Sequence, residues 1–255
     1  MHKKKYGQNF LINHNISKKI LFNETIKNQN ILEIGTGNLA LSKFIILSQP
    51  KKFLGVEVDK DLSDIYIKNK ISDKIIFKDA LKINERKFFN YENFSIISNL
   101  PFNISSELVI KWCKIQNSYN CIDSMVLMFQ KELAERIIAK KDTKKFGRLS
   151  ILCNAFFSIK KKLLVSKNDF FPIPKVDAMV LNFIPHKINK IKKNNFEKLE
   201  KITRIFFNER RKKNKKKIIN NFSVSQIRKY NLEKFYNLRA ENIDKEIFFV
   251  LSNVL

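Results

Sequence analysis

The sequence predicts an α/β protein with a parallel sheet, followed by a smaller helical domain. Short apolar runs alternate with helix-period segments as far as residue 186, which is typical of parallel strands joined by helices. From Lys187 onward the chain is rich in lysine and asparagine, keeps the helical period and has no strand-like run. We therefore expect an α/β domain over residues 1–186 and a helical domain over residues 187–255.

The chain is strongly basic. Its 255 residues include 50 Lys and Arg against 24 Asp and Glu, a formal net charge of +26. Such an excess favours a polyanionic partner such as nucleic acid. Lysine, asparagine, isoleucine and phenylalanine are abundant throughout, as in proteins encoded by A+T-rich genomes, so part of the excess reflects composition rather than a binding surface.

The sequence argues against a disulfide scaffold, a metal site and a membrane protein. Cys113, Cys121 and Cys153 form no CxxC pair and are expected to be small apolar residues in a reducing compartment. The three histidines have no ligand spacing, so we expect no metal. The start of the chain lacks the apolar region of a signal peptide, and no apolar run reaches spanning length. We expect a soluble, cytoplasmic monomer.

The first elements are a short aromatic and amide-rich segment, Tyr6–Leu11, and a helix over about residues 15–25. Phe10 and Leu11 indicate that the segment packs against the fold. A buried strand is predicted next, over Asn30–Ile34.

A glycine-containing turn ends this strand, in the run Glu33-Ile34-Gly35-Thr36-Gly37. Gly35 and Gly37 let the backbone approach a ligand closely, and the helix that follows offers free amide groups. Leu39 and Ala40 stand where a dinucleotide-binding fingerprint has its third glycine, so a pyrophosphate-binding loop is disfavoured.

Polar side chains follow three successive predicted strands. Glu57 lies at the end of the strand over residues 53–59, Asp79 follows the strand over residues 74–78, and Asn99 follows an apolar run that begins at Phe94. Each residue alone is more often a cap or turn residue. Together they indicate a ligand site, because ligands bind at the carboxyl edge of a parallel sheet. Glu57 suits the two hydroxyls of a ribose, and Asp79 can accept a hydrogen bond from an adenine amine.

The most informative stretch is Ser98-Asn99-Leu100-Pro101-Phe102-Asn103. Pro101 biases Leu100 toward extended geometry, so the Leu100 carbonyl projects outward. Asn99 and this carbonyl can accept hydrogen bonds from an exocyclic amine, while Phe102 stacks on the base that carries it. An ordinary turn is the alternative, and the order of the other motifs favours a site.

The remaining elements of the α/β domain are predicted from their periodicity. Helices are expected over about 105–113 and 130–138 and from about 147, and strands over 125–129, 159–165 and 176–184. Arg148 suits either a phosphate contact or a structural ion pair. Pro172 and Pro174 indicate an extended loop that exposes aromatic side chains, which fits stacking on an unpaired base as well as core packing.

The helical domain contains a strongly basic run. Seven of the eight residues in Arg210–Lys217 are basic, and Ile218, Ile219 and Phe222 follow. We expect a basic helix or turn docked on the fold that contacts phosphates. A final amphipathic helix is predicted from about Arg239 to Leu251.

In this order and spacing, the motifs closely resemble those of the rRNA adenine N6-dimethyltransferases over nearly the whole chain. The motifs are Gly-Gln-Asn-Phe-Leu (7–11), Glu-Ile-Gly-Thr-Gly (33–37), Glu57, Asp79-Ala80, Asn-Leu-Pro-Phe-Asn-Ile-Ser (99–105), Gln-Lys-Glu (130–132), Gly-Arg-Leu-Ser (147–150), Phe-x-Pro-x-Pro-Lys-Val-Asp (170–177), Arg-Arg-Lys (210–212) and Arg-Ala-Glu-Asn-Ile (239–243).

The resemblance implies a class I methyltransferase fold, which is Rossmann-like with a seven-stranded, mostly parallel sheet, followed by a small all-α C-terminal domain. It implies S-adenosylmethionine as the cofactor and small-subunit rRNA in a pre-ribosomal particle as the partner. The cofactor residues that it implies are Asn9, Leu11, Gly35, Gly37, Glu57, Asp79, Ala80 and Asn99.

The resemblance also implies the residues that hold the target adenine. These are Asn99, Leu100, Pro101 and Phe102, with Phe170 stacking on the other side of the base. The RNA-binding residues that we expect are Arg148, Arg210, Arg211, Lys212 and Lys213.

Within the family, Gly147–Ser150 and the aspartate of Lys175–Asp177 favour the enzyme that dimethylates two adjacent adenosines near the 3′ end of small-subunit rRNA during ribosome assembly. Two alternatives stay open at this point. One is a large-subunit rRNA methyltransferase of the macrolide-resistance type. The other is a non-catalytic nucleic-acid-binding factor on the same fold.

Overall fold

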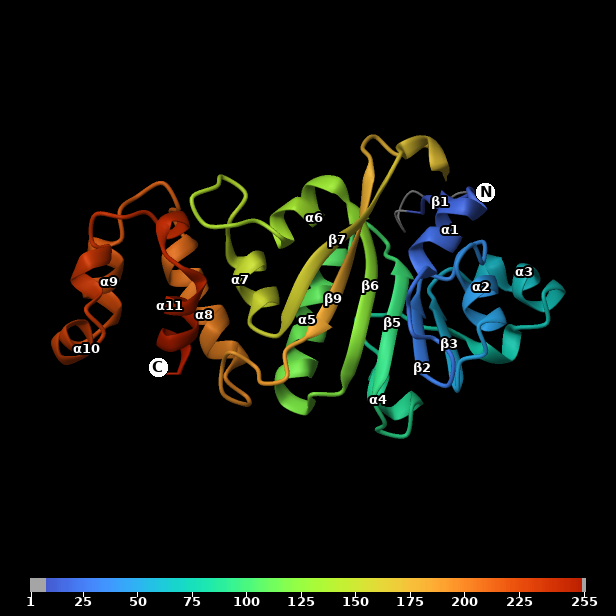
Figure 1. Ribbon diagram of the computed structural model, residues 1–255, viewed down its shortest axis with the longest axis horizontal. Helices are drawn as coiled ribbons and strands as arrows, with labels where there is room; N and C mark the ends of the chain where they lie inside the picture. Colours follow the sequence, from blue (N-terminus) through green and yellow to red (C-terminus); the bar gives the residue numbers. More distant parts are fainter. Residues whose placement is uncertain (1–7, 254–255) are drawn as a thin grey trace. The chain divides into compact units, whose positions relative to one another are not determined.

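The computed structural model describes residues 8–253, and contacts between Cα atoms divide it into two compact units (Figure 1). The sheet unit comprises the chain up to Trp112, Asn120–Ala134 and Ser158–Pro185. The helical unit comprises Cys113–Tyr119, Glu135–Phe157 and the chain from His186 onward. The division into domains at residue 187 stays a prediction.

The sheet unit contains a seven-stranded sheet of order β4-β3-β2-β5-β6-β9-β7. All its pairs from β4 to β6 are parallel, and β9 is antiparallel to β6, so the predicted mostly parallel sheet is confirmed. The strands are β2 (Asn30–Ile34), β3 (Lys52–Glu57), β4 (Ile75–Phe77), β5 (Phe94–Asn99), β6 (Ile122–Gln130), β7 (Phe157–Val165) and β9 (Ala178–Pro185).

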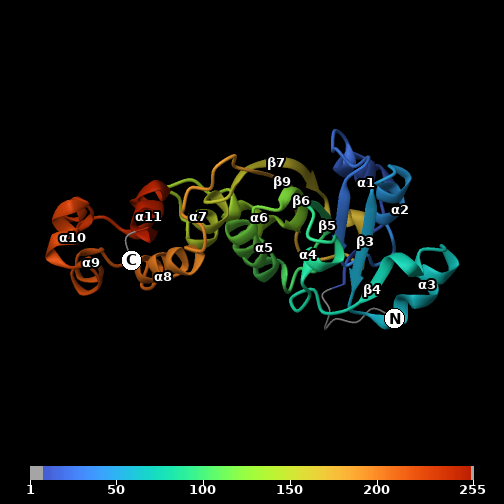
Figure 2. The same cartoon turned by 90° about the horizontal axis from the view of Figure 1, so that it is seen from below.

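The central strands are apolar because both faces of the sheet are covered. Every residue of β2 is buried, and so is every residue of β5 except the last, Asn99. On one face, Ile31, Ile97 and Val126 join one buried cluster with residues of the helices α1 (His14–Leu21) and α2 (Ser42–Leu47), which lie beside β2 and β3 in Figures 1 and 2. Parallel strands covered on both faces are buried along their length. Here the buried positions include the polar residues Glu33, Ser95 and Ser98 beside apolar ones.

The remaining helices fall between the strands or in the helical unit. Those of the sheet unit are α3 (Ser63–Lys68) and α4 (Glu85–Phe88), and the chain crosses between the units within α5 (Ser105–Tyr119) and α6 (Lys131–Ile137). Those of the helical unit are α7 (Arg148–Asn154), α8 (Phe196–Phe207), α9 (Lys215–Asn221), α10 (Val224–Lys229) and α11 (Lys245–Ser252).

An aromatic cluster forms the core of the helical unit. The Phe206 ring meets the Phe248 ring edge-on at 5.3 Å, and Phe222 lies 6.4 Å from Phe206. Phe207 contacts both Phe248 and Phe146, at 5.8 Å and 6.1 Å. These rings join α8, α9 and α11 to the segment before α7, so the region after the basic run is folded as expected.

Several elements differ from their predicted extents, and three differences are the largest or bear on the site. The helix from Ser105 continues to Tyr119, and the final helix begins only at Lys245, after a short 3₁₀ turn, η6 (Ala240–Asn242). The loop predicted to expose aromatics instead contains a short strand, β8 (Phe170–Phe171), which pairs with β1 (Phe10–Leu11). In this pairing Phe170 is buried and only Phe171 is exposed, because successive side chains of a strand point to opposite faces.

Within residues 8–253, the structure shows neither a membrane-spanning helix nor a metal-binding cluster. In residues 8–253 no helix is long and apolar enough to cross a membrane. The same part of the chain holds no group of three or more His, Cys, Asp or Glu side chains that could bind a metal ion.

A buried acid lies in the middle of the sheet. Glu33, on β2, is 2% exposed and accepts a hydrogen bond from Ser42 Oγ, at the start of α2, at 2.6 Å. Burial raises the pKa of Glu33 to about 8, with a smaller opposing effect from Ser42 and a small further rise from the charge of Glu57. Glu33 is therefore a neutral acid at pH 7.

We expect the stability of the fold to fall with rising pH because of Glu33. The unfolded chain releases this proton near pH 4.5 and the folded chain near 8, so the free energy of unfolding decreases between these values. Glu33→Gln should remove this dependence and be more stable at pH 7, by on the order of 1–3 kcal/mol. Urea unfolding at several pH values measures the free energy of unfolding of both proteins. The same pH dependence in both would contradict the raised pKa of Glu33.

Candidate functional site

Two adjoining hollows lie at the carboxyl ends of β2, β3 and β5. Gly35, Glu57, Val58 and Pro101 line both. The first is completed by Gln8, Asn9, Phe10, Gly37, Asn99, Leu100 and Phe102. The second, of about 200 Å³, is completed by Ile34, Val56, Lys78, Asp79, Ala80, Leu81, Asn103 and Ile104. The predicted meeting of polar side chains at this edge is thus observed.

The N-terminal segment borders the first hollow, as the Gly-Gln-Asn-Phe-Leu motif predicted, although Gly7 of the motif lies outside the described residues. Gln8 Nε2 donates to Asp59 Oδ2 at 2.8 Å. Asn38 Nδ2 donates to the Leu11 carbonyl at 3.0 Å. These bonds hold the segment against the turns that follow β2 and β3.

Both glycines of the turn after β2 are required by its geometry. Gly35 and Gly37 have φ angles of +72° and +50°, where side chains are rarely tolerated. A Cβ atom on Gly35 would lie 3.2 Å from the Pro101 ring, and one on Gly37 would lie 2.9 Å from the Phe10 ring. The turn therefore comes as close to its neighbours as a backbone can.

Leu39 stands where a dinucleotide-binding turn has its third glycine. Its φ is +66°, the left-handed region that a glycine would adopt, and its side chain is fully buried in the core. Tyr66 also fixes the turn, since its hydroxyl donates to the Gly37 carbonyl at 3.3 Å and accepts from Thr36 Oγ1 at 3.0 Å. Leu39 does not line either hollow.

Glu57 is a buried carboxylate held by backbone amides. Its Oε1 accepts from the amides of Val58 at 2.9 Å and Asp59 at 3.0 Å, and its Oε2 accepts from Gly37 at 3.1 Å. Burial raises the pKa of Glu57, and these three amides oppose the rise. Because each carboxylate oxygen can accept two hydrogen bonds, Oε2 keeps capacity for another donor.

The loop after β4 carries Asp79 and Ala80, which line the second hollow. Lys111, on α5, fixes this loop: its Nζ donates to the carbonyls of Ala80 and Ile83, both at 2.8 Å, and pairs with Glu85 Oε1 at 2.9 Å. The Glu85 side chain is 1% exposed and also accepts from Trp112 Nε1 at 3.0 Å. This clamp was not predicted, because it joins Lys111 to carbonyls 28 and 31 positions earlier in the chain.

Asn99 ends β5 at the rim of the first hollow, with its amide oriented by a neighbour. Its Nδ2 donates to the Asn9 carbonyl at 3.2 Å. Since a carbonyl can only accept, the Asn99 oxygen Oδ1 faces the other way, and Oδ1 is buried without a donor among the described residues. Such unpaired acceptors are uncommon in folded proteins, and because Asn99 lines the first hollow, a ligand bound there can supply the donor.

Two predicted site residues lie in the core rather than at the hollows. Leu11 and Phe170 are each 1% exposed and oppose each other in the β1–β8 pair. For the Phe170 ring to stack on a base, the two-stranded sheet would have to open. The stacking role of Phe170 stays a prediction, as does the place of Leu11 at the cofactor entrance.

The predicted RNA-binding residues lie in the helical unit with different surroundings. Arg148 forms an ion pair with Glu200 at 3.5 Å. Arg210 pairs with Glu241, and Lys212 pairs with Glu209, both at 2.5 Å. Lys213 Nζ lies 3.5 Å from Asn237 Oδ1, and Arg211 is exposed. Their phosphate contacts stay predictions.

Several residues that line the hollows were not predicted as site residues, namely Gln8, Phe10, Ile34, Val56, Val58, Lys78, Leu81, Asn103 and Ile104. Val58 is the most informative, because it is 43% exposed although apolar and directly follows Glu57. In the sequence, an apolar residue directly after an acid at a strand end could have indicated that Val58 lines the site.

A family model described as ribosomal RNA adenine dimethylase matches residues 1–254. This chain belongs to the ribosomal RNA adenine dimethylase family. A relative from Pelagibacter ubique, named ribosomal RNA small subunit methyltransferase A, is 42% identical over 98% of this chain and 95% of its own length. A relative of the same name from Mycoplasmopsis pulmonis is 38% identical over 98% and 97%.

Solved structures agree with membership of the ribosomal RNA adenine dimethylase family. A dimethyladenosine transferase from Plasmodium falciparum has a TM-score of 0.78 at 26% identity and covers 95% of each chain. The 23S rRNA methyltransferase ErmE has a TM-score of 0.70 at 18% identity, covers 96% of this chain and 98% of its own, and shows the fold alone. The predicted class I S-adenosylmethionine-dependent methyltransferase fold is confirmed.

S-adenosylmethionine is the cofactor that this family and fold imply, and the residues present fit it. The glycine turn leaves room for a ligand beside the backbone, Glu57 Oε2 can accept from a hydroxyl, and Val58 offers an apolar surface next to Asp79. The two hollows share a wall, so one extended molecule can occupy both.

We expect Lys111→Met to destabilise the sheet unit strongly. The change leaves the buried Glu85 carboxylate without its cation, which typically costs about 3–5 kcal/mol. Hydrogen exchange at residues 80–83 should become faster. Adding Glu85→Gln to Lys111→Met should recover part of the lost stability. Lys114→Met is the control, because Lys114 forms an exposed pair with Glu197, and exposed ion pairs contribute little to stability. Equal effects of the two lysine changes in urea unfolding would refute the clamp.

Proposed function

We propose that this protein uses S-adenosylmethionine to dimethylate N6 of two adjacent adenosines near the 3′ end of small-subunit (16S) rRNA during assembly of the subunit. Membership of the ribosomal RNA adenine dimethylase family supports the reaction class. The names of the relatives at 42% and 38% identity support the small subunit as the target. A cytoplasmic monomer that acts on a pre-ribosomal particle is part of the proposal.

The unsatisfied Asn99 Oδ1 is the observation that carries the proposal. A buried amide oxygen without a donor, at the rim of a hollow that Phe102 also lines, suits a planar amine on an aromatic base. No donor within residues 8–253 reaches the Leu100 carbonyl next to it. The two acceptors match the two hydrogens of an adenine amine.

These acceptors activate and orient the amine. The lone pair of adenine N6 is delocalised into the ring, which makes N6 a poor nucleophile. Hydrogen bonds from its two protons to Asn99 Oδ1 and the Leu100 carbonyl favour a more tetrahedral nitrogen, whose lone pair can then point at the methyl donor. Phe102 holds the base by stacking. Such positioning can contribute roughly 7–11 kcal/mol.

S-adenosylmethionine, when bound, supplies an electrophilic methyl group. We assign its ribose hydroxyls to Glu57, its adenine to Asp79, Ala80 and the exposed face of Val58, and its methionine part to the turn at Gly35 and Gly37 beside Asn9. No strong general base is needed, because the alkylated nitrogen is acidic and can lose its proton to water. Among the described residues, neither a histidine nor a cysteine lines the hollows.

The target adenosine has to leave its stack to reach the first hollow, which favours an adenosine in a loop or single strand. The exposed Phe171, next to the buried Phe170, is a candidate for stacking on a base outside the hollow.

Asn99→Ala should lower methyl transfer to small-subunit rRNA by roughly 10²–10³-fold, as removal of one positioned polar group does in other enzymes. RNA affinity should stay nearly unchanged, because phosphate contacts provide most of it. Labelled S-adenosylmethionine and nucleoside analysis measure the product. Asn69→Ala, a helix-end residue bonded only to Ile65, is the control. A non-catalytic binding factor would show no transfer even in the unchanged protein.

Glu57→Gln should weaken S-adenosylmethionine binding about 10- to 100-fold, the worth of a charge-assisted hydrogen bond of roughly 1.5–3 kcal/mol. In the unchanged protein, affinity should fall on acidification, and it should begin to fall above the usual pH range of a glutamate because burial raises the pKa of Glu57. The Gln variant should lack this fall. Calorimetry across pH is the measurement, with the exposed Glu92→Gln as control, and equal affinity of both proteins would contradict the ribose assignment.

A further inference from the structure

The segment between α6 and α7 is a basic loop in the helical unit. Residues 140–146 read Lys-Lys-Asp-Thr-Lys-Lys-Phe, and all except Phe146 are exposed. We call residues 140–146 the lysine loop. The sequence analysis assigned it no function, and none of its residues lines the hollows described above.

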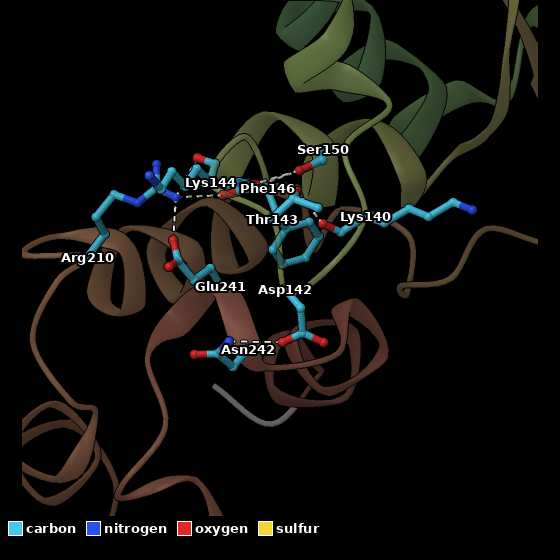
Figure 3. Close-up of polar contacts among 10 residues, drawn as sticks. Lys140, Asp142, Thr143, Lys144, Phe146, Ser150, Arg210, Glu241 and Asn242 are labelled. Atoms are coloured by element: carbon cyan, nitrogen blue, oxygen red, sulfur yellow. Dashed lines mark hydrogen bonds and ion pairs between the residues drawn. The ribbon is translucent and has the colours of Figure 1, made fainter.

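Arg210 holds the lysine loop by its backbone. Its Nη2 donates to the Lys144 carbonyl at 2.7 Å and lies 3.4 Å from the Phe146 carbonyl (Figure 3). The same guanidinium forms an ion pair with Glu241 Oε2, in η6, at 2.5 Å. One arginine thus joins the loop, the segment after α8 and η6.

A second set of bonds ties the other half of the loop to the same segment. The Asp142 amide donates to the Glu241 carbonyl at 2.9 Å, and the Asp142 side chain accepts from Asn242 Nδ2 at 2.9 Å (Figure 3). Lys141 pairs with Asp244 at 2.9 Å. Glu241 therefore contacts the loop through both its backbone and, by way of Arg210, its carboxylate.

The lysines of the loop divide into two kinds. Lys141 and Lys145 are paired with acids, namely Asp244 and Glu135. Within residues 8–253 no acid pairs with Lys140 or Lys144. In Figure 3 the Lys140 side chain points away from the bonded cluster. The backbone carbonyls of both residues are nevertheless used, by Thr143 Oγ1 at 2.7 Å and by Arg210.

Arg210 and Arg211 are adjacent in sequence but differ in use. The contacts of Arg210 to a carboxylate and two carbonyls are all made by Nη2, so this nitrogen is used within the helical unit. Arg211 is exposed. A loop whose backbone is already fixed loses less conformational freedom when its side chains bind. Rigid support beneath two ammonium groups without acidic partners is a favourable arrangement for binding a polyanion.

We propose that the lysine loop is an RNA-phosphate-binding element, and that Arg210 is a positioning residue that fixes it through Glu241. Lys140 and Lys144 make the phosphate contacts. This inference rests on the proposed function in that the polyanion is rRNA.

Two pairs of lysine substitutions test the proposal. For each protein, the affinity for small-subunit rRNA is measured without cofactor at several salt concentrations, which gives the slope of log affinity against log salt concentration. Lys140→Gln with Lys144→Gln should lower the salt slope by about 1.4–1.8, which is two contacts at 0.7–0.9 each. Lys198→Gln with Lys201→Gln, two exposed lysines on α8, removes the same charge and should change the slope by less than half as much. Equal changes from both pairs would overturn the proposal, because they would show that the effect is one of net charge.

Glu241→Gln separates a positioning role from a charge effect. The variant makes the protein more positive, so charge alone predicts tighter RNA binding. Loss of the Arg210 anchor predicts binding that is about 3- to 10-fold weaker, faster hydrogen exchange at residues 140–146, and little further loss when Lys140 and Lys144 are already glutamine. Tighter binding by Glu241→Gln would refute the positioning role.

Arg210→Lys keeps the charge but removes the Nη2 group that contacts all three acceptors. It tests the positioning role if Glu241→Gln fails to fold. We expect binding to weaken as in Glu241→Gln, whereas a direct phosphate contact by Arg210 predicts nearly unchanged binding. Methyl transfer by the unchanged protein separates a failure of the proposed function from a failure of this inference. Absence of methyl transfer to small-subunit rRNA would refute the proposed function, while transfer with unaltered salt slopes in the loop variants would refute this inference alone.

Discussion

The parallel alignment of β2, β3, β4 and β5 is the constraint on which the rest of this structure depends. Parallel strands end at the same edge, so the residues after each strand meet there although they are far apart in sequence. Gly35, Glu57 and Asn99 are brought together in this way. The turns at that edge are then fixed by backbone amides around Glu57, by Tyr66 beneath the glycine turn and by Lys111 beneath the Asp79 loop. The site is thus largely formed before any ligand binds.

The sequence predicted those parts of the site that depend on local pattern. Apolar runs showed the strands, and a polar residue after each run showed the edge that they share. The burial of Phe170 was not predicted, because it depends on pairing with Leu11, which is 159 positions earlier. The contacts of Lys111 and Arg210 within the protein were missed for the same reason, since their acceptors come from other segments. The positive φ of Leu39 was not predicted either, because leucine rarely adopts this conformation.

The positive charge of this protein has more than one use. Within the basic run, Arg210, Lys212 and Lys217 contact carboxylates or carbonyls of the helical unit, and Lys215 lies over the Tyr236 ring. Burial lowers the pKa of Lys217, which donates to the Phe206 carbonyl at 2.6 Å near the end of α8. A count of basic residues therefore overstates the surface available to RNA. The groups left over are the ones that can bind phosphate.

The proposed function requires that the first hollow, at Asn99, receives adenosines of small-subunit rRNA. The most direct measurement is methyl transfer from labelled S-adenosylmethionine to immature small subunits and, separately, to naked large-subunit rRNA, with analysis of the nucleosides formed. The account predicts dimethyladenosine from the small subunit alone. Product from large-subunit rRNA alone would contradict the assigned target, and no product from either RNA would contradict the assigned reaction.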